Sequence, residues 1–192
     1  MSETTLQPVV AEAFQALANA LDDLSPDRVD TPSLCQGWTV RNVLAHMTMA
    51  ARYSPDEFTA RLQAVGFDFT ALSNRLAEQD GGLPFDALVK DLRSDVMAHW
   101  EPPGGGFAGA LTHVVIHGLD ATAPLGLGRT CSDDAMRHVL DSLTTGGVHR
   151  HFGVEVDGLH LRATDLDWSY GSGRPVEAPA HELALMLTSR RI

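Results

Sequence analysis

The chain has 192 residues, of which 44% are hydrophobic and only 6% aromatic. This suits one globular domain, or one with a small appendage, whose core is built mainly from aliphatic side chains. The net charge of −11 comes from 25 acidic and 14 basic side chains, and such an acidic surface repels nucleic-acid phosphates and anionic lipid alike.

The sequence gives no sign of a membrane span or of secretion. No apolar run approaches the roughly 20 residues needed to cross a bilayer, and residues 1–8 lack the basic and apolar regions of a signal peptide. The two cysteines form neither a disulfide framework nor a paired zinc motif. We therefore expect a cytoplasmic protein that binds neither nucleic acid nor membrane.

Apolar residues at helical spacing predict a series of helices in the larger, N-terminal part of the chain. Thr39 and Ser132 have side chains that are preferred just before a helix, and the Pro-Gly run at residues 102–106 is a strong break. The predicted helices cover residues 9–24, 40–58, 68–79, 85–100, 107–123 and 133–145. We expect residues 1–146 to form an antiparallel four-helix bundle.

After residue 146 the pattern changes. Residues 154–161 alternate apolar and polar side chains around Asp157-Gly158, which is typical of a β-hairpin with a tight turn. Residues 168–173 extend this hairpin, and residues 180–190 have the pattern of an amphipathic helix. The predicted fold is therefore mainly α, with a small C-terminal α+β appendage over residues 147–192 that consists of a β-hairpin plus a helix.

Two of the nine histidines, His113 and His117, stand four residues apart on a predicted helix. This spacing places both imidazoles on one helix face, where two nitrogens can chelate one metal ion. The pair alone slightly favours hydrogen-bonded core histidines over metal ligands. His46, beside the apolar stripe of the second predicted helix, is the best candidate for a third ligand. With this third histidine, metal binding becomes the favoured interpretation. Three imidazoles with an open position suit zinc best, while nickel, iron and cobalt also fit.

Three stretches of the chain resemble one family. Residues 35–46 read CQGWTVRNVLAH, residues 113–120 read HVVIHGLD, and residues 163–173 carry an Asp-Trp-Gly-Gly series that is followed by Arg190. These stretches resemble the motifs of the mycothiol-dependent maleylpyruvate isomerase family, within the DinB-like group of four-helix-bundle metalloenzymes. The resemblance implies one metal ligand from the first stretch and two from the second, which by position are His46, His113 and His117.

One departure from the family pattern affects the expected chemistry, because His113 stands where the family has glutamate. Three neutral ligands leave the site more cationic, which suits an anionic thiolate and resembles the thiol transferases of the group. The resemblance implies an enzyme that uses a mycothiol-like thiol for S-transfer to, or isomerisation of, a small electrophile. A non-catalytic metal- or thiol-binding stress protein of this fold is the alternative, and a bundle with incidental histidines is a third interpretation.

Four further residues need an interpretation, and two of them have two alternatives each. Asp120 follows His117 on the same helix face and either accepts a hydrogen bond from a ligand imidazole or is solvated. Arg190 matches a family arginine that could meet a carboxylate of the thiol or substrate, or it is solvated at a helix C-terminus. Cys35 and Trp38 are expected mainly to pack. The reacting group beyond a metal-bound thiol or water is not identified, and a homodimer is compatible with the fold.

Overall fold

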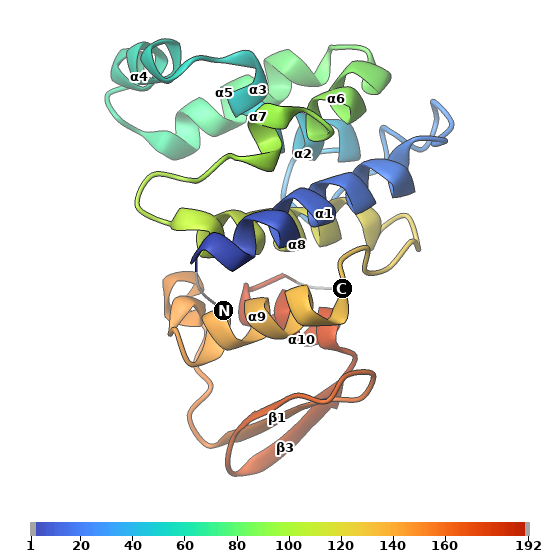
Figure 1. Cartoon of the computed structure of the whole chain (residues 1–192), viewed down its shortest axis with the longest axis vertical. Coiled ribbons are helices and arrows are strands. Elements are labelled where there is room, and N and C mark those ends of the chain that lie inside the picture. Colours follow the sequence, from blue (N-terminus) through green and yellow to red (C-terminus); the bar gives the residue numbers. More distant parts are fainter. Residues whose placement is uncertain (1–2, 191–192) are drawn as a thin grey trace.

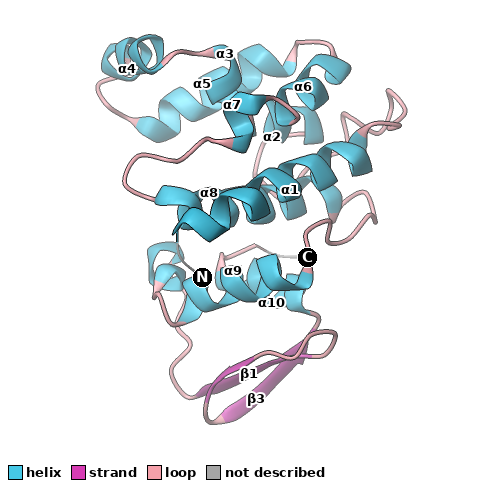
Figure 2. Ribbon diagram, in the orientation of Figure 1, coloured by secondary structure: helices cyan, strands magenta, loops and turns pink. Residues whose placement is uncertain are grey.

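The structure is a computed structural model that describes residues 3–190. Helices fill the body of the molecule and the strands lie together at one end (Figure 2). The α-helices are α1 (Glu3–Leu21), α2 (Val40–Met47), α3 (Met49–Arg52), α4 (Pro55–Ala64), α5 (Phe69–Gly81), α6 (Phe85–Leu92), α7 (Asp95–Ala98), α8 (Gly106–Thr122), α9 (Asp133–Thr144) and α10 (Ala180–Leu187). The predicted fold class, mainly α with a small C-terminal α+β part, is confirmed.

Helix α8 is the central element of the fold and packs against α1, α2, α9 and α10. Helices α2 and α5 lie on one side of α1 and α8, whereas α9, α10 and then the sheet lie on the other (Figure 1). One apolar core joins these layers through fully buried leucines, namely Leu17, Leu44, Leu111, Leu140 and Leu185. The core therefore continues from the helical body into the C-terminal part, and a domain boundary at residue 146 stays a prediction.

Within residues 3–190 no helix combines the length and the apolar character that crossing a membrane requires.

The single helix predicted for residues 40–58 is wrong in extent, because the chain forms α2, α3 and the start of α4 there. Pro55 has no backbone N–H to donate inside a helix, so it takes the first position of α4 instead. Ser54 caps this helix by accepting a hydrogen bond from the backbone N–H of Glu57 at 3.3 Å. Helix α4 then continues to Ala64, beyond the end of the helix predicted for residues 40–58.

The helix predicted for residues 85–100 is also interrupted, for a similar local reason. Ser94 has an extended backbone and its hydroxyl accepts from the backbone N–H of Met97 at 3.3 Å, so it ends α6 and starts α7. The predicted apolar stripe ends at this break, because Leu92 is buried whereas Val96 is 50% exposed and Met97 is the buried residue of α7.

The hairpin predicted around Asp157-Gly158 is wrong in its pairing. The sheet contains β1 (Leu159–Ala163), β2 (Ser169–Gly171) and β3 (Arg174–Ala178) in the order β2-β1-β3, with β1 antiparallel to β2 and parallel to β3. The backbone N–H of Val154 instead bonds to the carbonyl of His149 at 3.2 Å, which ties this segment to the 3-10 helix η1 (Val148–Phe152).

A glycine allows β3 to pair with β1, whereas the sequence pattern predicted residues 154–156 as the partner of that strand. Gly173 has φ of +125°, and a Cβ there would collide with the carbonyl oxygen of Gly158. The next residue, Arg174, donates its backbone N–H to that same carbonyl at 2.9 Å. The close approach of two glycines therefore sets the parallel register of β1 and β3.

Candidate metal centre

Helix α2 places His46 in the interior through a chain of contacts that begins at its N-terminus. The side chain of Asn42 accepts from the backbone N–H of Thr39 at 2.9 Å and from its hydroxyl at 2.7 Å. The amide nitrogen of Asn42 donates to the carbonyl of Ala77 on α5 at 2.9 Å. His46 lies one turn later on the same face, and only 6% of its surface is exposed.

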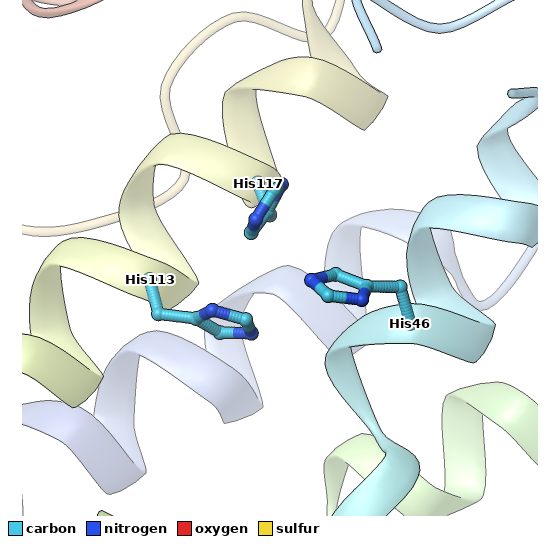
Figure 3. A group of neighbouring side chains, drawn as sticks. All are labelled: His46, His113 and His117. Atoms are coloured by element: carbon cyan, nitrogen blue, oxygen red, sulfur yellow. The ribbon is translucent and has the colours of Figure 1, made fainter. Parts of the chain in front are cut away.

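Helix α8 supplies the two other histidines, which face His46 across the space between α8 and α2 (Figure 3). The ring centroids of His113 and His117 lie 4.8 Å apart, and that of His46 lies 5.4 Å from the first and 4.8 Å from the second. One nitrogen from each ring can be chosen so that all three lie within 4.8 Å of one another. The fold thus brings together the three residues that the sequence singled out.

Burial keeps two of these imidazoles neutral. Desolvation is the main cause that lowers the pKa of His46 to about 3 and the pKa of His113 well below 6.5, and the neighbouring His117 adds to both shifts. A neutral imidazole has a lone pair on one ring nitrogen, which is the form that a metal ion binds.

The three histidines also pass a structural test of fit to a cation. Nε2 of His113 is buried and has no hydrogen-bond partner among residues 3–190. A buried polar atom without a partner costs about 1–3 kcal/mol. A metal ion bound at Nε2 would supply that missing partner, so the site fits a metal ion better than it fits a hydrogen-bonded core.

Asp120 and Arg190 hold His117 from the opposite side. His117 lies with Nδ1 2.9 Å from Oδ2 of Asp120, and Arg190 donates to both carboxylate oxygens from Nε and a terminal nitrogen at 3.0 Å. Burial by itself raises the pKa of the Asp120 carboxyl, but the hydrogen bonds from His117 and Arg190 outweigh it and lower the pKa below its ordinary value. Asp120 is therefore a buried carboxylate, and it makes Nδ1 of His117 a donor and leaves Nε2 facing the other histidines.

Cys35 contacts the same carboxylate, an arrangement that the sequence did not reveal. Its Sγ lies 3.1 Å from Oδ2 of Asp120 and 3.9 Å from Nδ1 of His117. These three residues are a second group with ligand atoms close enough for a metal ion. Burial first, and then the Asp120 charge, raise the pKa of the Cys35 thiol far above its usual range. A protonated thiol and a carboxylate already paired with Arg190 make this group a poorer cation site than the three histidines.

Two tryptophans lie against the histidine cluster. The Trp38 ring centroid is 5.0 Å from that of His46, and the Trp100 centroid is 4.9 Å from that of His113. The indole nitrogen of Trp38 donates to Asn74 on α5 at 3.1 Å. From the sequence, Trp38 is expected mainly to pack, and Trp100 only ends the helix predicted for residues 85–100, because neither pattern shows which ring meets a histidine.

Another α5 residue, Ser73, contacts the site directly. Its hydroxyl lies 2.8 Å from Nδ1 of His46, and only 6% of its surface is exposed. No motif in the sequence indicates this contact, because the two residues are 27 positions apart on different helices. Its only local signal is a small polar residue beside the apolar positions of α5.

Comparison with known proteins supports the resemblance drawn from the motifs. Residues 10–102, just under half of the chain, match the family model of the mycothiol maleylpyruvate isomerase N-terminal domain. No curated protein matches the chain. The whole chain matches 90% of the crystal structure of the mycothiol-dependent maleylpyruvate isomerase, with a TM-score of 0.60 and 15% sequence identity. At that identity the structural match shows a shared fold, and the resemblance to this family is confirmed.

Proposed function

We propose that this chain is a metal-dependent enzyme that uses a low-molecular-weight, mycothiol-like thiol to act on a small electrophile. The observation that carries the proposal is the group of three histidines, in which Nε2 of His113 is buried without a partner among the described residues. The family match over residues 10–102 supports the choice of thiol, and the shared fold is that of a mycothiol-dependent isomerase.

The proposed metal ligands are His46, His113 and His117. Three imidazole nitrogens with a free fourth position favour zinc, with nickel, iron or cobalt as alternatives. A divalent ion held there would supply Lewis acidity, which lowers the pKa of a bound thiol and favours its reactive thiolate form. The three imidazole ligands are neutral, so they do not offset the positive charge of the metal ion that stabilises a thiolate.

The surrounding residues orient the site and limit its contact with water. Asp120 holds the His117 ring through Nδ1, and Trp38 and Trp100 cover two of the histidines. Each of the three guanidinium nitrogens of Arg190 donates to a protein acceptor, two to Asp120 and one to the carbonyl of Thr188. We therefore propose that the main role of Arg190 is to fix Asp120 in place. Binding a carboxylate of the thiol or substrate would be a secondary role.

The two candidate reactions share their first bond. The thiol loses its proton to solvent, and its sulfur gives an electron pair to an electrophilic carbon, which gives up a leaving group or the π bond to its neighbouring atom. In S-transfer the new C–S bond remains, and the leaving group departs with its bonding pair or the neighbouring atom takes up a proton. In isomerisation the sulfur adds to a double bond, and after rotation about the resulting single bond the C–S bond breaks, which restores the double bond and returns the thiol. We favour S-transfer because His113, a neutral residue, takes the position of the family's glutamate.

Metal analysis of the full chain, purified without a His-tag, tests the site. We expect about one metal ion per chain, a loss of most of it in His117→Ala, and normal content in His149→Ala. His149 is a suitable control because its buried ring bonds to the carbonyl of Leu143 and belongs to neither metal-capable group. Wild-type protein without metal, or His117→Ala with unchanged metal, would refute the assignment.

Activity separates the enzyme from the non-catalytic alternative. Metal-loaded protein should accelerate the reaction of a mycothiol-type thiol with chlorodinitrobenzene or a bimane, and His117→Ala should not. A protein that binds metal and thiol without any rate increase would instead be a binding protein of this fold.

Free thiols at Cys35 and Cys131 agree with the proposed location in the reducing cytoplasm. We also propose a homodimer, which gel filtration would test.

A further inference from the structure

Helix α5 lies outside the three family-like stretches, yet it contacts the site through two consecutive residues. Ser73 lies 2.8 Å from Nδ1 of His46, and Asn74 accepts from the indole of Trp38, whose ring packs on that histidine. Helices α2 and α5 pack against each other, and both contacts come from the same turn of α5. The surroundings of His46 are therefore set by α5 as much as by its own helix.

The contact with Ser73 determines which nitrogen of His46 is available to a metal ion. In a neutral imidazole one nitrogen is a donor and the other an acceptor. If the Ser73 oxygen accepts from Nδ1–H, the lone pair is on Nε2. If the hydroxyl instead donates to Nδ1, Nε2 carries the hydrogen and cannot bind a metal. A serine hydroxyl can act in both ways, so this hydrogen bond has two states with opposite consequences.

The other two histidines indicate which state the site needs. His117 has Nδ1 on a carboxylate, which can only accept, and this leaves its Nε2 with the lone pair. His113 has a buried Nε2 without a partner among the described residues. A cluster in which each ring offers Nε2 requires Nδ1 of His46 to be a donor, and Ser73 is the group placed to accept from it.

We propose that Ser73 is a positioning residue of the metal centre, whose hydroxyl accepts a hydrogen bond from Nδ1 of His46 and thereby presents Nε2 of that histidine to a divalent cation. This inference rests on the proposed metal site. Hydrogen-bond partners of metal-ligating histidines typically change metal affinity by about 10- to 100-fold when removed. An uncharged partner also orients the ring without adding negative charge to the site.

The first test measures zinc affinity of the full chain by competition with a chromophoric chelator. Ser73→Ala should bind zinc about 10- to 100-fold more weakly than wild type, and Ser73→Thr, which keeps a hydroxyl, should recover most of the affinity. The control is Thr144→Ala, which removes a buried hydroxyl that donates to Leu140 on α9, outside the site. The control should leave zinc affinity unchanged.

The second test needs no variant. Long-range ¹H–¹⁵N correlation spectra of the metal-free wild-type protein report the tautomer of each histidine, and His46 should carry its hydrogen on Nδ1. This readout stays informative even if Ser73→Ala does not fold. Hydrogen on Nε2 of His46 would overturn the proposal, because Ser73 would then hold the ring in the form that cannot bind a metal.

The outcomes distinguish this inference from the proposed function. If Ser73→Ala binds zinc as tightly as wild type, or if Thr144→Ala weakens binding to the same extent, Ser73 is only a packing residue and the metal site stands. If the wild-type protein itself does not bind zinc, nickel, iron or cobalt, the proposed function fails first. A large loss confined to Ser73→Ala, with recovery in Ser73→Thr, is the result that we expect.

Discussion

Replacement of Asp120 by asparagine tests the network behind the histidines most directly. The Asp120→Asn side chain keeps the shape of the carboxylate but removes its charge. Arg190, whose side chain is only 15% exposed, then has no counter-ion, and Nδ1 of His117 loses a charged acceptor. Both effects act on the folded protein, because the unfolded chain hydrates all three groups.

The expected loss is large. Breaking a buried ion pair by removing one partner costs about 3–5 kcal/mol. We expect the lower end, near 3 kcal/mol, because Arg190 keeps some exposure and its bond to the carbonyl of Thr188. For a chain of this size that corresponds to a fall in Tm of about 6–12 °C. Zinc affinity should fall by about 10- to 100-fold, because an uncharged amide oxygen holds the His117 ring more weakly than the carboxylate does.

Urea unfolding of the metal-free protein measures the loss of stability, and competition with a chelator measures the loss of zinc affinity. The double variant Asp120→Asn/Arg190→Gln should be more stable than the sum of the two single losses predicts, since it removes the unpaired charge as well. A loss below about 1 kcal/mol in Asp120→Asn, within the range of ordinary substitutions, would show that the pair does not act as a buried ion pair. Additive losses in the double variant would refute the coupling.

Two further predictions concern pH and helix packing. Metal-free protein should lose stability as the pH falls from 6.5 toward 3, because burial lowers the pKa of His46 to about 3 and that of His113 well below 6.5, so the unfolded chain binds protons that the folded chain does not. Urea midpoints measured across this range should fall with pH in wild type and fall less in His46→Phe, and an equal slope in both would contradict the reasoning. Gly81→Ala should cost about 1–3 kcal/mol despite the better helix propensity of alanine, because a Cβ there would collide with the amide of Asn42. The neighbouring Gly82→Ala, whose added Cβ meets only ordinary contact, should change the urea midpoint little, and similar losses in both would show that the contact with Asn42 is not what requires the glycine.

Local patterns in the sequence determined the part of the fold that depends on local physics. Periodicity identified α5, α8 and α9 closely, since a helix with one buried face must repeat its apolar residues every three to four positions. It found α1 as well, but α1 begins at Glu3 and ends at Leu21 rather than covering residues 9–24. It failed where a cap decides the outcome, because Ser54 with Pro55, and Ser94, start new helices inside the single helices predicted for residues 40–58 and 85–100. In the sheet it indicated the segments of β1 and β2, which pair antiparallel, but it missed β3, because a parallel partner for β1 comes from a later segment that no turn signal identifies.

The residues of the candidate site also divide into those that the sequence indicates and those that only the tertiary structure shows. The spacing of His113 and His117 follows from helical geometry and is visible in the sequence alone, and the motif around Trp38 added His46. Only the tertiary structure decided which side chains surround them. Ser73 reaches His46 across 27 positions, and Arg190 reaches Asp120 across 70. Contacts between segments far apart in the sequence depend on how whole elements pack, and no local pattern in the sequence records that packing.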